Sequence, residues 1–464
     1  MRVCNECNKK WSYPVQRCIF CGGLIKDIIP TKFTVKGITK VFVPSTGHKK
    51  VPYYNVLLKD ENDDFHIKKT FKEFKLNQTF EVKNEKGKTI VALCGVGYSI
   101  VDATIRAIKL MGGIEFNPKD KILIKPNLVL AKSASTGIIT NPLVVEGIIK
   151  YLLEKGISKS NLFIGEGSLQ GVDTDKMLKK TEYYELCEKY GLKFFDLLSG
   201  KFINREIGIG KNKRVVQISE LVLDMDLIID VPVIKTHMQT GVSLGIKNMK
   251  GVINHSSRKV MHMHELEDQI AYLSTALPKY ITIADGSIGL EGMGPLTLGK
   301  PANFGVVVAG KDPVAVDTAI CHIIKIKVPK HIRKAAEIGL GEGDIKKINF
   351  VGDEVAVVSK KFEPADSRIS PHPDIALIDG KPCSSCINSV WTTLHSLKDI
   401  PTEVVTIALG SQINEDMIGS GEIIAMGDCA VRALKNKGCA QKLKGCPPSE
   451  KDQKEFLKKW LNLP

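Results

Sequence analysis

Two pairs of cysteines at the start of the chain have the spacing of a metal site. They form the pattern Cys4-x2-Cys7-x10-Cys18-x2-Cys21. Each pair makes one tight turn, and two such turns can surround a single ion. Four thiolates in a tetrahedron suit Zn²⁺, with a single iron ion as the lesser alternative. Because the protein would fill all four coordination positions, we expect a structural metal site.

A second group of cysteines lies near the end of the chain. Cys383-x2-Cys386 follows a predicted strand, and a Gly-x-Cys motif at Cys429 and a Gly-Cys-Pro-Pro motif at Cys446 come later. Three sites are compatible with these residues: a dithiol of the first pair alone, a second zinc site, or a [4Fe–4S] cluster held by four cysteines at strand ends. We favour the cluster, because the dithiol leaves the two later motifs unexplained.

The remaining cysteines have less distinctive surroundings. Cys439 could replace Cys429 or Cys446 as a ligand, lie beside the cluster as a redox-active thiol, or be structural. Three single cysteines are expected to be small buried side chains: Cys94, Cys187 and Cys321.

Polar side chains end several predicted strands in the middle of the chain. In open α/β sheets, ligands bind at the carboxyl ends of the strands. Each of these side chains alone fits a solvated loop charge or a turn residue, but their repetition at equivalent positions favours one shared crevice. The residues that could share this crevice are Lys125, Glu166, Lys235, His237 and Asp285, and we expect all of them except Asp285 to carry the chemistry.

A second set of polar residues follows between 237 and 264, where four of the ten histidines fall. Metal ligation is one interpretation, and an anion site of lysine, asparagine and backbone amides is another. His262 and His264 would point to different sides of a helix, which argues against a simple two-histidine metal site. The predicted anion-binding residues are Asn127, Thr240, Lys247, Asn248, His255 and Asp285.

An α/β body over residues 89–363 must position these groups. Strands alternate with helical stretches such as 142–155, which is typical of a mostly parallel sheet covered by helices. Residues 227–234 read as a buried strand that Asp230 and Pro232 interrupt, so we expect it to be irregular or nearer an edge. The strand over 304–309 leads into Gly310-Lys311-Asp312-Pro313, which we assign to the same site edge.

Two small modules precede the body. Residues 1–24 are predicted to form a zinc ribbon and residues 25–88 a small OB-like β-barrel. The barrel strands are predicted over 33–35, 39–43, 53–58, 65–69 and 79–82. Five aromatic side chains are interpreted as core positions of these strands: Phe33, Phe42, Tyr53, Tyr54 and Phe65.

A separate domain follows the body. Residues 364–373 are rich in proline, serine and charge and read as a linker. Residues 374–464 are predicted to form a flavodoxin-like α/β cluster domain. The whole chain is therefore expected to be an α/β multidomain protein. In the cluster domain we predict strands over 374–378, 403–409 and 422–426, and helices from after Cys386 to about 397 and over 450–461.

Segments of the body resemble the domain-of-unknown-function family 362, which is often attached to iron–sulfur modules. The resemblance covers about residues 90–330 and implies the fold and a redox association, but no settled substrate. The glycines do not complete a dinucleotide-binding fingerprint, so a nicotinamide cofactor is not expected. The segments that carry the resemblance are Ile124–Leu128, Ile164–Glu166, Lys235–Gly241, Gly245–Gly251, Asp285–Gly286, Gly292–Pro295 and Gly310–Asp317.

Both ends of the chain also resemble known domains. The order of motifs in 374–464 is similar to the proximal-cluster domain of the nickel–iron hydrogenase small subunit and its complex I counterpart. That resemblance implies that the [4Fe–4S] ligands are Cys383, Cys386, Cys429 and Cys446. Residues 1–86 resemble the rubredoxin-like ribbon and OB fold of a family associated with acyl-CoA enzymes.

Composition and charge limit the functional classes. The 464 residues suggest about three domains, and 43% apolar with 25% charged residues exclude a disordered chain, a collagen-like fibre and a small disulfide scaffold. The net charge is +15, and residues 1–89 hold 18 basic and 9 acidic side chains. Only 9 of the 66 basic residues are arginine, which weakens the case for nucleic-acid binding.

We expect a cytoplasmic protein, because the sequence shows neither a signal peptide nor a membrane-spanning apolar run. The leading hypothesis is an iron–sulfur oxidoreductase that passes electrons from a donor such as a ferredoxin to an anionic small molecule in the body. The alternatives are a lysine-rich nucleic-acid-binding protein and, as the weaker of the two, a scaffold for an acyl-CoA enzyme.

Overall fold

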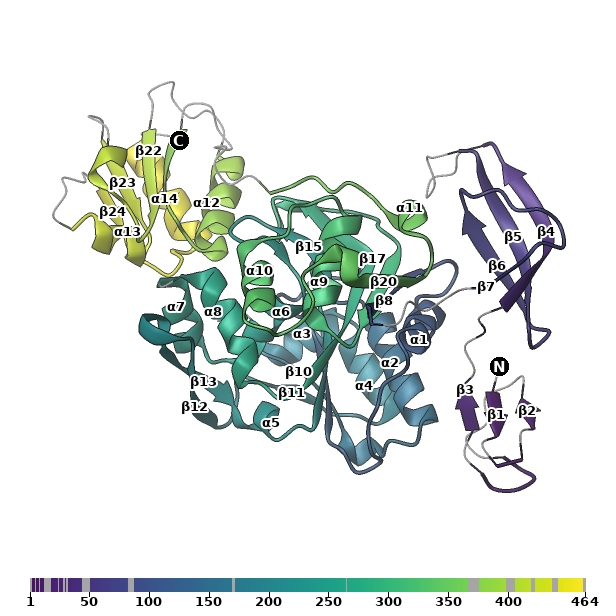
Figure 1. Cartoon of the computed structure of the whole chain (residues 1–464). Helices are drawn as coiled ribbons and strands as arrows, with labels where there is room; N and C mark the ends of the chain where they lie inside the picture. The colour runs from purple at the N-terminus through teal and green to yellow at the C-terminus, as the bar shows by residue number, and fades with distance from the viewer. Residues whose placement is uncertain are drawn as a thin grey trace.

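An α/β body lies at the centre of the molecule, with the N-terminal modules on one side and the C-terminal domain on the other (Figure 1). The computed structural model describes residues 2–4, 6–7, 9–11, 18–23, 25–27, 30, 32–43, 51–81, 87–168, 172–263, 265–365, 375–397, 405–418, 422–435 and 441–461.

The body is built on one large sheet whose main path runs in the order β11-β10-β9-β14-β17-β19-β8-β20. The strands on this path are parallel to one another except β19, which is antiparallel to both neighbours. This confirms the predicted mostly parallel central sheet. The bounds are β8 Thr89–Gly95, β9 Ile122–Pro126, β10 Leu162–Glu166, β11 Phe194–Asp196, β14 Leu227–Val231, β17 Tyr280–Gly292, β19 Val306–Gly310 and β20 Ile348–Gly352.

Helices cover the sheet, and two large apolar clusters fill the layers between them. Every residue of β9, β14 and β19 is buried, as expected for central strands covered on both faces. The main helices are α1 Ile100–Leu110, α2 Pro142–Glu154, α3 Thr174–Lys180, α4 Tyr183–Tyr190, α6 Gly245–Asn248, α7 His255–Met263, α8 Leu266–Leu273, α9 Pro313–Ile323 and α10 Lys330–Glu337.

The predicted strand over 227–234 is broken at Pro232. β14 ends at Val231, and the chain resumes as β15 (Val233–His237), which pairs further along β17 and with β16 (Gly241–Ser243). The irregularity is confirmed, but the edge position is wrong, because β14 lies between β9 and β17. Pro232 lacks an N–H group and ends the ladder there, while its carbonyl accepts a hydrogen bond from the Asp285 amide at 2.8 Å.

The direction of β19 corrects another expectation. Because β19 is antiparallel to its neighbours, Gly310-Lys311-Asp312-Pro313 lies at the edge of the sheet opposite the carboxyl ends of β9, β10 and β14. Asp312 caps α9 there, accepting the Ala315 amide at 3.0 Å. The assignment of this segment to the site edge is therefore wrong.

The N-terminal modules are two small antiparallel sheets. One contains β1 (Arg2–Cys4), β2 (Lys10–Trp11) and β3 (Ile25–Asp27). The other has the order β6-β5-β4-β7, with β4 Lys32–Val41, β5 Tyr53–Asp60, β6 Phe65–Thr70 and β7 Thr79–Glu81. The two predicted strands over 33–35 and 39–43 are one strand, β4, with an irregularity between Val35 and Gly37.

The aromatic side chains of this module are not all in its core. Tyr53 and Tyr54 are buried, but Phe42 is 65% exposed and Phe65 is 59% exposed, so the core assignment is wrong for these two. Phe42 follows the end of β4, and Phe65 opens the edge strand β6, where no further described strand covers it. Closure of the sheet into an OB barrel stays a prediction, and Val82 lies outside the described residues.

The C-terminal domain is a parallel sheet in the order β21-β22-β23-β24. Its described strands follow chain order, unlike the 2-1-3-4-5 order of flavodoxin, so the likeness is limited to a parallel sheet flanked by helices. Residues 366–374 and Cys439 lie outside the described residues. The bounds are β21 Ile375–Gly380, α12 Ser384–Ser396, β22 Val405–Gly410, β23 Ile423–Met426, α13 Asp428–Ala433, β24 Gln441–Leu443 and α14 Glu450–Trp460.

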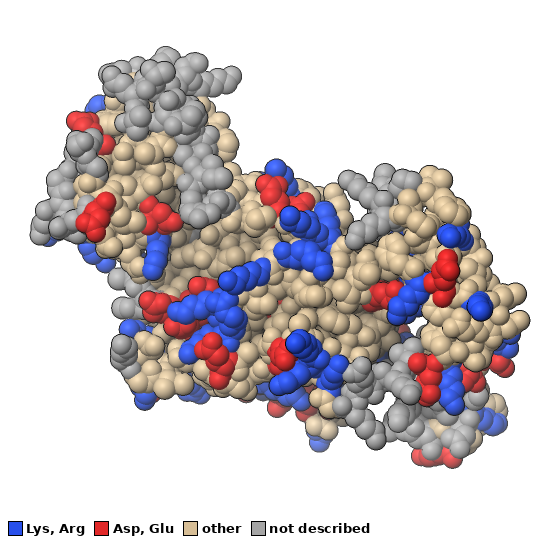
Figure 2. Space-filling model, turned by 45° about the horizontal axis from the view of Figure 1, so that its top comes forward, with Lys and Arg blue, Asp and Glu red and all other residues tan. Residues whose placement is uncertain are grey.

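The surface carries charges of both signs. On the face shown in Figure 2, lysine and arginine side chains gather in separate groups with acidic side chains beside them. No helix in the described part of the chain is long and apolar enough to cross a membrane.

Candidate functional site

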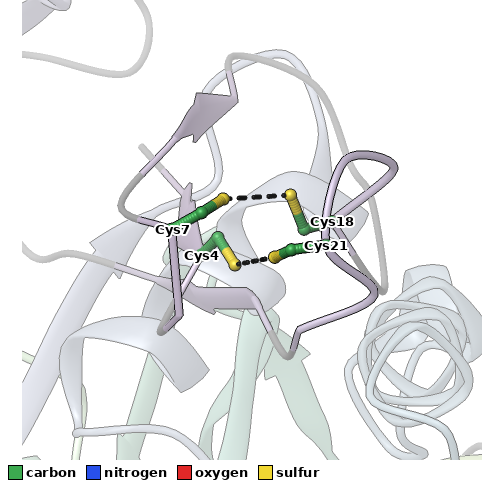
Figure 3. A group of neighbouring side chains, drawn as sticks. All are labelled: Cys4, Cys7, Cys18 and Cys21. Atoms are coloured by element: carbon green, nitrogen blue, oxygen red, sulfur yellow. Dashed lines mark hydrogen bonds between the residues drawn. The ribbon is translucent and has the colours of Figure 1, made fainter.

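The four N-terminal cysteines meet in one group (Figure 3). Their sulfur atoms all lie within 4.8 Å of one another, with Cys4 and Cys21 3.3 Å apart and Cys7 and Cys18 3.4 Å apart. The turn at Cys18 is closed by backbone hydrogen bonds from Cys18 to Gly23 and from Gly22 to Cys18. Four thiols gathered this closely fit a single metal ion such as zinc.

The C-terminal sheet brings its cysteines to one edge. Cys383, Cys429 and Cys446 each follow the carboxyl end of a parallel strand, and Cys386 lies in the first turn of α12. The pKa of the Cys386 thiol is raised by its hydrogen bond to Cys383, by burial and by the charges of the other three thiols. We call Cys383, Cys386, Cys429 and Cys446 the C-terminal cysteine group.

The loops that carry this group have a defined backbone conformation. A side chain at Gly427 would come within 3.6 Å of the Cys386 sulfur, and Gly427 has a φ of +91° that a side chain would strain. Asp428 accepts the Gly445 amide at 3.0 Å, which ties the loop before Cys429 to the loop before Cys446. Four cysteines on tied loops are the donor set that a [4Fe–4S] cluster requires, so the residues fit it.

Helix α12 joins this domain to the body. Ile387 and Trp391, one helical turn apart, are buried against Met238, which directly follows His237. In Figure 1, α12 lies between the C-terminal sheet and the body. The contact places the first turn of α12, with Cys383 and Cys386, over the carboxyl ends of the body strands.

A cavity of about 140 Å³ lies at this junction. We call it the cationic cavity, because four of its lining residues are lysine or arginine, two more are histidine, and only one, Glu166, is acidic. Ser385, between Cys383 and Cys386, reaches it from the C-terminal domain. The lining residues used below are Asn127, Glu166, Lys235, His237, Lys247, Asn248, Lys250, Arg258, His262 and Ser385.

Lys125 and Glu166 form a buried ion pair under the cationic cavity. Lys125 Nζ lies 3.0 Å from Glu166 Oε2, and the two side chains are 0% and 3% exposed. Glu166 also accepts the backbone amides of Gly167 and Leu128 at 2.7 and 3.3 Å. Adjacent parallel strands β9 and β10 place the two side chains together, as predicted from their strand-end positions.

A chain of hydrogen bonds orients Lys235. Its Nζ donates to Asn127 Oδ1 at 2.7 Å, Asn127 Nδ2 donates to Asn248 Oδ1 at 2.7 Å, and Asn248 Nδ2 donates to Asp230 Oδ1 at 2.7 Å. Nζ also donates to the Ile138 carbonyl at 2.8 Å, which leaves one of its three protons for the cavity. Burial and nearby positive charges lower the pKa of Lys235 to about 7.

His237 faces the cavity as a neutral hydrogen-bond donor. Its Nδ1 accepts the backbone amides of Gln239 and Thr240 at 3.1 and 3.3 Å, so Nδ1 carries no proton and Nε2 does. Burial and the charge of Lys247 hold the pKa of the imidazole well below its usual value. A neutral imidazole that presents an N–H group can polarise a carbonyl or bind an oxyanion.

Three further basic groups line the cavity, and none of them forms an ion pair with an acidic side chain in the described part of the chain. Burial lowers the pKa of Lys247 to about 7 and that of Lys250 well below its usual value. Lys250 Nζ contacts His262 Nε2 at 2.9 Å. Arg258 donates to the backbone carbonyls of Gly167, Ser168, Lys250, Gly251 and Ile253. Such a concentration of donors in a dry space favours an anionic ligand.

The structure brings most of the predicted residues together, but not all. Thr240 holds His237 through its amide and does not line the cavity. Asp285 accepts the amides of Asn141 and Ser287 at 2.7 and 2.8 Å, which fixes the start of α2 rather than binding a ligand. His255 opens α7 and is also absent from the cavity wall. The structure therefore places none of these three on the wall of the cavity.

Several site residues were missing from the predicted set. Lys250 and His262 stand within the recognised polar stretch and could have been included, whereas nothing in the sequence marks Arg258. Asp317, the last residue of a motif noted for its resemblance, accepts the amides of Gly245 and Ile246 at 2.8 and 3.0 Å and so fixes the first turn of α6, which carries Lys247 and Asn248.

The α/β body that carries the cavity is similar to a known protein family. Residues 122–322 match a family model described as "Domain of unknown function (DUF362)". The DUF362 match contains Lys125, Glu166, Lys235 and Lys247, and it supports the resemblance stated for the body. The two terminal modules lie outside the matched residues.

Two individual proteins are also similar to the chain. The thylakoid-associated protein sll1697 of Synechocystis sp. (strain ATCC 27184 / PCC 6803 / Kazusa) is 25% identical over 234 residues, which make up 48% of this chain and 69% of the relative. The lactate racemase apoprotein from Thermoanaerobacterium thermosaccharolyticum aligns at 17% identity with a TM-score of 0.34, over 55% of this chain and 61% of that chain. The chain thus spans less than two thirds of that racemase, and so low a TM-score carries no argument.

Proposed function

We propose that this chain is a cytoplasmic iron–sulfur oxidoreductase that passes electrons to a small anion bound in the cationic cavity. One observation carries the proposal: the C-terminal cysteine group and the cavity form one junction. Ser385 lines the cavity, and the positive charges of Lys250 and Lys259 from the body act on Cys383 and Cys429, respectively.

The C-terminal cysteine group would hold a [4Fe–4S] cluster, which supplies single electrons when bound. The donor would be a protein such as a ferredoxin. The N-terminal cysteines would hold a structural Zn²⁺. This module and the C-terminal domain lie on opposite sides of the body (Figure 1), so we assign the module no part in the chemistry.

The body residues would bind the anion and move protons. Lys247 and Lys250 would neutralise its charge, and His237 Nε2 would donate a hydrogen bond to its reacting oxygen. Lys235 suits the role of proton donor, because a pKa of about 7 matches neutral pH. The Lys125–Glu166 pair would hold the floor of the cavity in place.

Anaerobic purification of the full chain tests the proposal. We expect about four iron and four sulfide ions per chain, and loss of both in Cys383→Ala. Cys187→Ala, which removes a thiol from α4 far from the cysteine group, should keep them. Absence of iron and sulfide from freshly reconstituted wild-type protein would refute the assignment.

A second candidate function rests on the exposed aromatic rings of the N-terminal module. Phe42 and Phe65 are exposed on a lysine-rich sheet, and bases of single-stranded nucleic acid stack on such rings. Fluorescence anisotropy with a labelled single-stranded oligonucleotide tests it: binding should weaken steeply with salt and with Phe65→Ala. No binding at low salt would exclude it.

A further inference from the structure

Lys247 stands apart from the other lysines of the cationic cavity. Lys125 pairs with Glu166, Lys235 donates to Asn127 and Ile138, and Lys250 contacts His262. Lys247 lines the wall of the cavity, and its side chain makes no hydrogen bond or ion pair with any residue in the described part of the chain. Its amine is therefore available to a ligand.

The surroundings of Lys247 disfavour an added proton. Its charge lowers the pKa values of Lys235, Lys250 and His237, so these groups lie close enough to repel a proton on its own nitrogen. Burial by itself brings its pKa to about 7. A lysine amine that is desolvated and lies beside other cations is a nucleophile near neutral pH.

The cavity also supplies what a carbonyl compound needs. His237 Nε2–H can donate to a carbonyl oxygen, the free proton of Lys235 can pass to that oxygen, and Lys250 can hold a carboxylate. A volume of about 140 Å³ is well below the roughly 300–1,000 Å³ of pockets for drug-sized ligands, which favours a small ligand over a nucleotide. The space suits an oxo acid of a few carbon atoms.

We propose that Lys247 forms an imine with the carbonyl carbon of a small 2-oxo acid. This inference rests on the anion site of the proposed function and names its substrate class. The amine nitrogen forms a bond to the carbonyl carbon, and the carbonyl oxygen takes up a proton. The nitrogen then returns one proton to Lys235 and passes the other to the new hydroxyl group, the carbon–oxygen bond breaks, and one water molecule leaves with no change of oxidation state.

Reductive trapping tests this step without an electron donor. The full chain is incubated anaerobically at pH 7 with glyoxylate, pyruvate or 2-oxoglutarate and sodium cyanoborohydride, and peptides are then mapped by mass spectrometry. We expect at least one acid to label Lys247 at least tenfold more than exposed Lys132. Acetaldehyde, which lacks the carboxylate, should label Lys247 several-fold less than that acid.

Matched variants complete the experiment. Lys247→Arg replaces the lysine amine by a guanidinium group that does not form an imine, and it should lose the cavity label while still unfolding in one cooperative thermal transition. Lys132→Arg should leave the label at Lys247 unchanged. Equal labelling of Lys247 and Lys132, or no label at Lys247 with any of the three acids, would overturn the imine. Either result is independent of the iron content, so failure of the imine is distinct from failure of the iron–sulfur assignment.

Discussion

Individual side chains in the cationic cavity are held at a cost to stability. The Lys125–Glu166 pair is buried, and each charge is compensated by the other. Lys235 is fully buried and Lys247 is partly buried, neither forms an ion pair with a carboxylate in the described part of the chain, and their pKa values of about 7 report that cost. Sites that bind or react are where such strain is expected.

Removing one member of the buried pair should be severely destabilising. We expect Glu166→Gln to lower the free energy of unfolding by about 3–5 kcal/mol, because it leaves the Lys125 charge uncompensated. The exposed pair of Lys121 and Asp224 is the control, and Asp224→Asn should change stability by less than about 1 kcal/mol. Urea unfolding measures both, and similar small losses would show that the buried pair is not maintained in solution.

Lys247 should make stability depend on pH in a defined direction. Its folded pKa of about 7 lies below the unfolded value of about 10.4, so the native state is penalised most below pH 7. The penalty fades as pH rises towards 10.4. Lys247→Met should therefore be more stable than wild type by about 1 kcal/mol or more at pH 6, with the difference shrinking by pH 10. Thermal melts across this pH range measure the difference in stability, with Lys132→Met as the control variant. A stability difference between Lys247→Met and wild type that grew with pH would contradict the prediction.

Short strands and helices position these side chains. The sequence allowed some of these elements to be predicted correctly and others not. Strand ends at Lys125, Glu166 and Lys235 were predictable, because a parallel sheet aligns its carboxyl ends. The reversal of β19 was not predictable, because an apolar run such as Val306–Ala309 fits either direction. Asp285 was misassigned for a related reason: a strand-end carboxylate can equally cap a neighbouring helix.

Helix α6 depends on a single buried carboxylate. Asp317 accepts two backbone amides of its first turn, and an asparagine could accept only one of them comfortably. Asp317→Asn should cost about 1–3 kcal/mol and weaken anion binding, since α6 carries Lys247 and Asn248. Asp312→Asn, which keeps an oxygen for the cap of α9 but loses the oxygen that accepts the Glu342 amide, should reduce stability without weakening binding of glyoxylate, as calorimetry would measure. Equal effects of the two variants on affinity would argue against this role of Asp317.

Helix α12 should control docking of the C-terminal domain. Trp391 packs against Met238 in the body, whereas Val390 packs in the core of its own domain. Trp391→Ala should therefore speed hydrogen exchange around Met238, and Val390→Ala should destabilise the C-terminal domain without that effect. Unchanged exchange around Met238 in Trp391→Ala would show that the contact does not couple the two parts.

At the scale of the whole molecule, the two cysteine sites are separate. The ribbon lies on the other side of the body from the C-terminal domain (Figure 1). Cys18→Ser should therefore release the metal of the ribbon and leave the iron content of the chain unchanged, as elemental analysis would measure. Loss of iron in this variant would mean that the two sites depend on each other.

The domain order was predictable from composition and motif spacing, but the junction was not. Cys-x2-Cys spacing identifies thiol sites because two residues between ligands suffice for one turn. Nothing in the sequence indicates that Ile387 and Trp391 seat the cysteines on the cavity, since apolar residues at this spacing fit any helix core. That junction is the basis of the proposed function.

Electron spin resonance of the dithionite-reduced full chain, with and without saturating glyoxylate, tests the central claim that the cysteine group and the cavity form one site. Calorimetry first establishes that glyoxylate binds. The account predicts a [4Fe–4S] signal whose g-values shift on binding, and no shift in Lys247→Met. A reduced cluster whose spectrum is identical with and without bound glyoxylate would contradict it.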